Sequence, residues 1–136
     1  MKENKFMPAC AVWAGLLLII AAIVHLSGVN DIVVAVKAGD ISVTHARSVL
    51  TAWIFAGLGQ LLLGIWLMYL SKDLRHRSRR AWWQTLIIAI GLAGAGVGSW
   101  LLYPGSIHVV FLLLISVILL VPLILFVAQY HTRTKA

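Results

Sequence analysis

The fold is decided by uninterrupted apolar stretches such as Ile107-HVVFLLLISVILLVPLILFVAQ-Tyr130, which contains no Asp, Glu, Lys or Arg. A helix needs about 20 such residues to cross the hydrocarbon core of a bilayer, which is about 30 Å thick. Three more stretches of this kind precede it, Phe6–Leu26, Val49–Leu70 and Ala81–Tyr103. Because unpaired backbone groups are costly in lipid, each stretch is predicted to span the membrane as a helix.

The composition agrees with a membrane protein of one domain. The chain has 136 residues, of which 62% are hydrophobic and 11% charged. Soluble domains have about half apolar and about a quarter charged residues. We therefore predict a single all-α domain, residues 1–136, folded as a four-transmembrane-helix bundle. A cleaved signal peptide is the alternative for the first stretch, and the length of that stretch disfavours it.

The basic residues predict the orientation. Nine of the eleven Lys and Arg residues lie in the N-terminal segment, the connection 71–80 or the C-terminal segment, and only Lys37 and Arg47 lie on the other side. Loops rich in Lys and Arg stay in the cytoplasm, so both termini are predicted to be cytoplasmic, in a plasma (inner) membrane. The net charge of +7 then suits anionic lipid headgroups on that side, and nucleic acid is not an expected partner.

The two outer connections differ in length. Residues 30–39 start with Asn-Asp, continue with apolar residues and end with Gly, which predicts a short capped helix lying at the outer interface. A short strand is the alternative, since Val and Ile dominate. Thr44 is predicted to cap the second span. Residues 104–106 are Pro-Gly-Ser, a tight connection that predicts an antiparallel hairpin of spans three and four.

Polar side chains near the outer ends of the spans predict an outward-facing pocket. Intramembrane ionisable groups are costly and often functional. Histidine and arginine together suit an anionic group, although both are also ordinary residues at membrane interfaces. A cation in the first turn of a helix opposes the helix dipole, so Arg47 at the start of the second span predicts an anionic partner such as a lipid phosphate. The predicted pocket residues are His25, His45, Arg47, Tyr103 and His108.

Two of these histidines are also candidate metal ligands. His25 and His108 are expected at equal depth on neighbouring helices, where two imidazoles can hold a haem iron or a divalent metal. No pair of histidines shows a close ligand spacing such as His-x-x-His. The single cysteine, Cys10, allows neither an intrachain disulfide nor a cysteine-based metal site.

Gln60 is the polar residue nearest the middle of the second span. Ala52, Ala56 and Gly64 share its helix face. A small face with one amide is typical of close helix packing, with a hydrogen bond across the interface. Ser116 of the fourth span is the predicted partner of this amide. The alternative is a role for Gln60 in contacting a ligand or lining a pore.

The third span carries small residues on two adjacent faces, which predict close helix packing either within the bundle or between copies of the chain. A homo-oligomer or a partner membrane protein is therefore expected. Pro122 is predicted to kink the fourth span. The small residues of the third span are Gly91, Gly94, Ala95, Gly98 and Ser99.

Several functions are disfavoured and three remain. No span contains Asp or Glu, which argues against proton-coupled antiport through a membrane carboxylate and against an acidic selectivity ring. Catalytic sequence motifs are absent. The first hypothesis is a binding or accessory protein that uses the outward pocket. The second is an oligomeric transporter or channel, with Gln60, Ser99 and Ser116 near its path. The third is a membrane enzyme or redox protein that uses His25 and His108 on a lipophilic substrate, a quinone or a haem.

Overall fold

The computed structural model describes residues 5–102, 104 and 107–131, and the regular structure in these residues is entirely helical. The long helices are α1 (Phe6–Ser27), α3 (Val43–Arg75), α4 (Arg79–Leu102) and α5 (Ile107–Leu125), and the short ones are α2 (Val29–Ala38) and α6 (Val127–His131). Four helices, counting α1 and α2 as one, are long and apolar enough to cross a membrane. The chain is thus a small multi-pass membrane protein, and the predicted all-helical fold with four membrane helices is confirmed.

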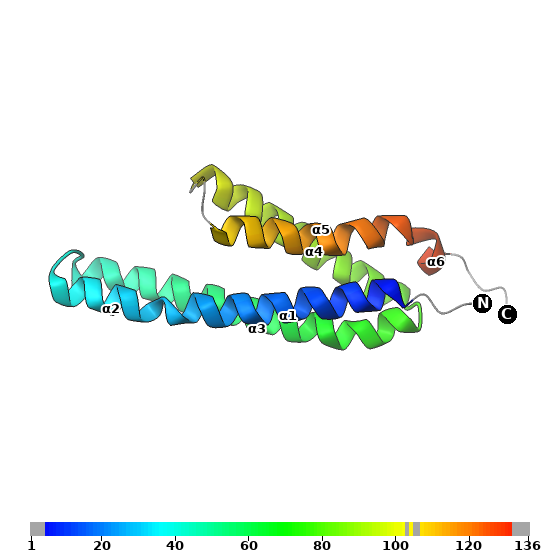
Figure 1. The fold of residues 1–136 in the computed structure, drawn as a ribbon, viewed down its shortest axis with the longest axis horizontal. Coiled ribbons are helices and arrows are strands. Elements are labelled where there is room, and N and C mark those ends of the chain that lie inside the picture. The colour runs from blue at the N-terminus through cyan, green and yellow to red at the C-terminus, as the bar shows by residue number, and fades with distance from the viewer. Residues whose placement is uncertain (1–4, 103, 105–106, 132–136) are drawn as a thin grey trace.

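The two ends of the bundle differ in charge. Both ends of the described chain and the connection from α3 to α4 lie together, and we call this the basic end because residues 75–80 hold four arginines. The far end holds the turn from α2 to α3 and the start of α5 (Figure 1). The cytoplasmic location of the basic end stays a prediction.

The helices form two hairpins that separate toward the far end (Figure 1). α1 packs along α3, α4 packs along α5, and α1 also contacts α5. Aliphatic side chains from these four helices fill the half of the bundle nearer the basic end, among them Leu18, Leu67, Ala89 and Leu119. Because the hairpins diverge beyond this core, space opens between α1 and α5 in the far half.

α3 extends beyond its apolar part at both ends. It has 33 residues, which is about 50 Å at roughly 1.5 Å per residue. The helix begins at Val43 because the hydroxyl of Ser42 caps it, accepting a hydrogen bond from the backbone N–H of His45 at 3.3 Å. Thr44, the predicted cap, lies inside the first turn, so that prediction is wrong. The apolar stretch Val49–Leu70 therefore predicts only the middle of α3, because the helix continues into polar residues at both ends.

α2 confirms the short helix predicted in the first outer connection, and the strand alternative is wrong. The helix ends at Gly39, whose φ of 83° lies in the left-handed region that glycine adopts easily. Gly28, between α1 and α2, has helical dihedral angles of −65° and −10°. α2 therefore continues nearly along the direction of α1 (Figure 1). Its predicted location at the membrane interface stays a prediction.

Two aromatic side chains connect helices at the basic end, one within the α4–α5 hairpin and one between the hairpins. α5 ends at Leu125, shortly after Pro122, and the chain turns before α6. A helix end leaves its last carbonyls without intrahelical partners. The indole of Trp82 donates a hydrogen bond to one of them, the carbonyl of Leu123, at 3.2 Å. The hydroxyl of Tyr130 donates to the carbonyl of Leu74 at 3.1 Å, which ties α6 to the end of α3.

Candidate functional site

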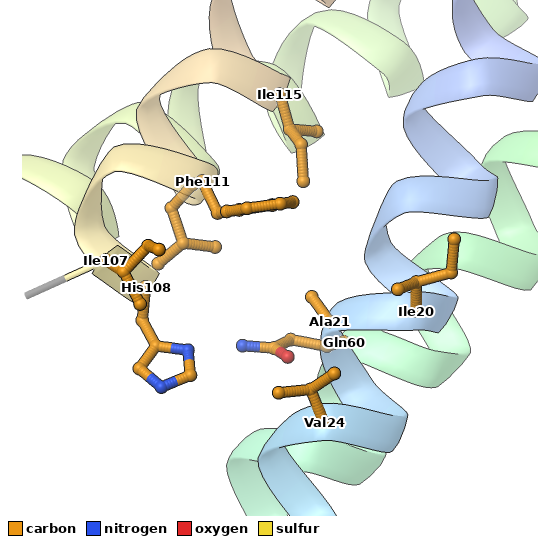
Figure 2. A pocket seen from close by; sticks show the side chains of 9 residues that line it. Ile20, Ala21, Val24, Gln60, Ile107, His108, Phe111 and Ile115 are labelled. Carbon is orange, nitrogen blue, oxygen red and sulfur yellow. The ribbon is translucent and has the colours of Figure 1, made fainter.

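A cavity of about 160 Å³ lies between α1, α3 and α5, in the far half of the bundle where the hairpins separate. Figure 2 shows its two apolar sides, with Ile20 and Val24 of α1 opposite Phe111 and Ile115 of α5. Gln60 enters it from α3. The cavity is therefore an apolar space that few polar groups reach. Its lining residues are Ile20, Ala21, Val24, Gln60, Ile107, His108, Phe111, Leu112 and Ile115.

Gln60 and His108 are the polar side chains of this lining. The amide of Gln60 projects past α1 toward His108 (Figure 2). Its oxygen Oε1 is buried and has no hydrogen-bond partner among the described residues. The predicted partner, Ser116, donates its hydroxyl to the carbonyl of Leu113 in its own helix at 2.7 Å, so the predicted Gln60–Ser116 pair is wrong. A buried unpaired acceptor costs about 1–3 kcal/mol, so the amide oxygen favours any donor that enters the cavity.

His25 does not line the cavity, but its ring contacts His108, which does. The His25 ring stacks on Trp53 of α3, with ring centroids 4.2 Å apart and planes 11° apart. It also meets His108 edge-on, at 5.9 Å and 86°. The Nε2 atom of His25 is buried, and the described part of the chain offers it no hydrogen-bond partner. The structure therefore adds a second unpaired polar atom next to the cavity.

Trp53 holds the end of α1 in place, and the sequence analysis did not single it out. Its indole N–H donates to the backbone carbonyl of His25, which lies in the last turn of α1. Carbonyls in the last turn need partners from outside the helix. The sequence does indicate a role for Trp53, because it precedes Gln60 by two helical turns and so lies on the same helix face. A buried indole N–H usually finds a hydrogen-bond acceptor, so a Trp on the helix face that carries an intramembrane amide indicates a polar contact there.

The histidine pair offers few ligands to a metal. Within residues 5–102, 104 and 107–131 no group of three His, Cys, Asp or Glu side chains is close enough to hold an ion. The rings of His25 and His108 are in contact, but an ion between them would need ligands from outside the described part of the chain. A cavity of about 160 Å³ is also close to the roughly 150 Å³ that accommodates benzene. It suits a single ring better than a haem.

The other predicted pocket residues lie elsewhere. His45 and Arg47 are exposed in the first two turns of α3, and Arg47 shares a separate hollow between α2 and α3 with Lys37. Arg47 precedes Gln60 by about 20 Å along the helix axis. Because α3 begins at Val43, Arg47 lies past the first turn, and the dipole argument for an anionic partner weakens. Tyr103 lies outside the described residues.

The small face predicted around Gln60 is only partly in contact. Ala52 and Ala56 are exposed, whereas Gly64 is buried. Gly57 takes the place of the alanines, because a β-carbon there would lie 2.6 Å from a methyl carbon of Leu26. The packing face of α3 thus runs along Gly57 and Gly64, and Gln60 lies beside it.

The predicted packing glycines of α4 face open space within the described chain. A β-carbon added at Gly91, Gly94 or Gly98 would have no described atom within 4 Å. Ala95 is exposed, and Ser99 is partly exposed and does not line the cavity. Gly96 faces α5 instead, where its β-carbon would lie 2.8 Å from a methyl carbon of Leu113. Packing between copies of the chain stays a prediction.

The chain matches no protein-family model, no curated protein and no solved structure.

Proposed function

We propose that this protein binds a small, mostly apolar molecule with one hydrogen-bonding group in the cavity between α1, α3 and α5. The observation that carries the proposal is the buried oxygen Oε1 of Gln60, which faces an otherwise apolar space and has no partner among the described residues. A second such atom, Nε2 of His25, lies on the ring that contacts His108 of the lining. Ligand sites are typically apolar cavities with a few polar groups that fix the ligand's orientation. In this proposal the protein is a binding or accessory protein rather than an enzyme.

The size of the cavity limits the ligand. About 160 Å³ holds a ring of benzene size with one small substituent, by comparison with engineered cavities of roughly 150 Å³. Six aliphatic or aromatic side chains and Ala21 line it, so a charged group would lose its hydration without compensation. A neutral hydroxyl fits better, because it can donate to Gln60 and accept from a histidine ring.

The divergence of the hairpins supports entry from the bilayer. α1 and α5 separate toward the far end (Figure 1), and the cavity lies between them in that half. The basic end carries most of the arginines, which favours a cytoplasmic location for it. The ligand then enters from the outer leaflet of a plasma membrane. Contacts between copies through the exposed face of α4 would leave the space between α1 and α5 free.

Photo-crosslinking tests the proposal. The purified protein in lipid nanodiscs is irradiated with a diazirine derivative of phenol and, separately, with the matching derivative of toluene. These ring compounds have nearly the same shape, but only phenol offers a hydroxyl. We expect the phenol probe to label peptides from α1 and α5 around Ile20 and Phe111, about tenfold more than the toluene probe, because one hydrogen bond to a buried acceptor contributes roughly that factor.

Two matched pairs of variants make the result specific. Gln60→Leu should remove the preference for phenol, whereas Gln84→Leu, the same change on α4 away from this cavity, should keep it. Ala21→Trp should block labelling by both probes, whereas Ala95→Trp at an exposed position of α4 should not. Labelling that both α3 and α1 variants leave intact, or that maps outside the cavity, would contradict the proposal.

A further inference from the structure

A second hollow lies on the opposite side of α3, along its contact with α4. In the apolar part of both helices it has a volume of about 490 Å³ and is lined by Leu62, Leu63, Ile65, Trp66, Gln84, Ile87 and Ile88. Toward the basic end it continues into a hollow of about 210 Å³. Trp66 and Gln84 line both parts. We call the two parts together the α3–α4 groove.

The polar end of the α3–α4 groove holds one charge of each sign. Asp73 of α3 and Arg80 of α4 both line it, with Tyr69 beside them. Both charged side chains are exposed, and the described residues show no ion pair between them. Trp66 and Tyr69 lie next to each other, with ring centroids 5.8 Å apart. Such half-exposed aromatic side chains are typical of the depth of lipid headgroups.

Each of the two charges opposes the dipole of its own helix. Asp73 lies in the last turn of α3, where the partial charge of the helix end is negative. Arg80 lies in the first turn of α4, where it is positive. An anion bound near Arg80 would be stabilised both by the guanidinium and by the positive helix end of α4. A cation bound near Asp73 would be stabilised both by the carboxylate and by the negative helix end of α3.

The length of the α3–α4 groove matches one leaflet. Asp73 and Leu62 are 11 positions apart in α3, which is about 16 Å along a helix axis. Half of a hydrocarbon core of about 30 Å is about 15 Å. The groove therefore offers apolar walls for an acyl chain over the depth of one leaflet, with its charged end at the headgroups.

From this arrangement we infer that the α3–α4 groove binds one phospholipid that carries a phosphate and a primary amine, of the phosphatidylethanolamine type. Arg80 holds the phosphate, which a guanidinium recognises well. Asp73 accepts hydrogen bonds from the ammonium group. The acyl chains lie along Leu62, Leu63 and Ile87. An anionic lipid without the amine would leave its charge near Asp73, and a choline headgroup has no N–H to donate.

Competition between lipids tests this inference on the full chain. The delipidated protein in detergent is mixed with equal amounts of phosphatidylethanolamine, phosphatidylcholine and phosphatidylglycerol that have the same acyl chains. Native mass spectrometry then counts the lipid retained. We expect one phosphatidylethanolamine per chain, retained about tenfold over either competitor, since a hydrogen bond between charged groups contributes roughly that factor. Preferential retention of phosphatidylglycerol, or equal retention of all three, would overturn the inference.

The variants separate the headgroup from the acyl chain. Arg80→Ala should reduce retention of phosphatidylethanolamine and phosphatidylglycerol alike, whereas Arg79→Ala, its neighbour outside the α3–α4 groove, should not. Asp73→Asn should abolish the preference for phosphatidylethanolamine, and Asp31→Asn on α2 should preserve it. Ile87→Trp should lower retention of every lipid, while Ile90→Trp, exposed on α4 away from the groove, should not. Equal effects of Arg80→Ala and Arg79→Ala would show that the binding is only unspecific attraction to the basic end.

Discussion

Gly15 of α1 and Gly64 of α3 lie so close that each blocks a side chain on the other. A β-carbon at Gly15 would lie 2.6 Å from the carbonyl oxygen of Gly64, and one at Gly64 would lie 2.7 Å from the carbonyl oxygen of Gly15. Backbone cannot move aside as a flexible side chain does. At this reciprocal contact neither position can take a side chain unless α1 and α3 move apart.

Substitution at this contact should destabilise the protein. Gly64→Val forces α1 and α3 apart, and overpacking of this kind costs about 1–3 kcal/mol. The free energy of unfolding, measured by circular dichroism in mixed micelles of mild detergent and dodecyl sulfate, should fall by that amount. Gly59→Val is the matched control, because the same helix has open space at that position. Equal losses in the two variants would show that helix propensity, not the contact with Gly15, is responsible.

The exposed glycines of α4 predict a different response. Gly94 has no described atom within 4 Å of its β-carbon position, so Gly94→Ile should leave the fold of the single chain intact. Small faces allow close approach of membrane helices, and the variant should therefore weaken self-association. Single-molecule photobleaching of labelled protein in lipid vesicles measures the number of copies. A wild-type protein that is monomeric at all protein-to-lipid ratios would contradict this prediction.

Trp53 should contribute to stability through both its ring and its N–H. Trp53→Phe keeps an aromatic ring against His25 but loses the donor to the His25 carbonyl, which should cost about 1 kcal/mol. Trp53→Leu also loses the stacking, which adds roughly 0.5–1.5 kcal/mol. The same unfolding measurement checks both values. Trp100→Phe, at an exposed position of α4, should change little, and a loss there equal to that of Trp53→Phe would contradict the assignment.

The membrane helices could be predicted from the sequence because each apolar stretch carries its own signal. The bounds of α3 could not, since hydropathy does not register a cap such as Ser42 or a polar last turn that remains helical. Because α3 starts before the apolar stretch, His45 and Arg47 lie away from the cavity, whereas the rings of His25 and His108 are in contact.

Side-chain packing was predicted less well, for a physical reason. Gly57 and Gly64 contact α1, whereas Ala52 and Ala56 are exposed, yet all four are small residues of one helix. The face of a helix that packs depends on the angle at which it crosses its neighbour. That angle depends on the side chains of both helices. For the same reason the sequence of α4 shows that its small residues form a face, but it does not show whether that face lies inside or outside the bundle.

The ionisation of Tyr130 should affect stability at high pH. Burial raises the pKa of its hydroxyl group above the ordinary value, and the positive charge of Arg77 opposes part of this shift. A pKa raised in the folded state means that this contribution is fully present below the unfolded pKa of about 10. It is then lost as the pH rises through the folded pKa. The free energy of unfolding should therefore fall more steeply above about pH 10 in the wild type than in Tyr130→Phe, and identical curves would contradict the burial of this group.

Cysteine accessibility tests the orientation of the chain. In a Cys10→Ser background, His76→Cys places a thiol in the basic connection after α3, and Asp40→Cys places one in the turn between α2 and α3, both at exposed positions. Since arginine-rich loops stay in the cytoplasm, a membrane-impermeant maleimide should label Asp40→Cys on intact cells. It should label His76→Cys only after the cells are permeabilised. The reverse pattern would place the basic end outside, and the cavity between α1, α3 and α5 would then open toward the inner leaflet.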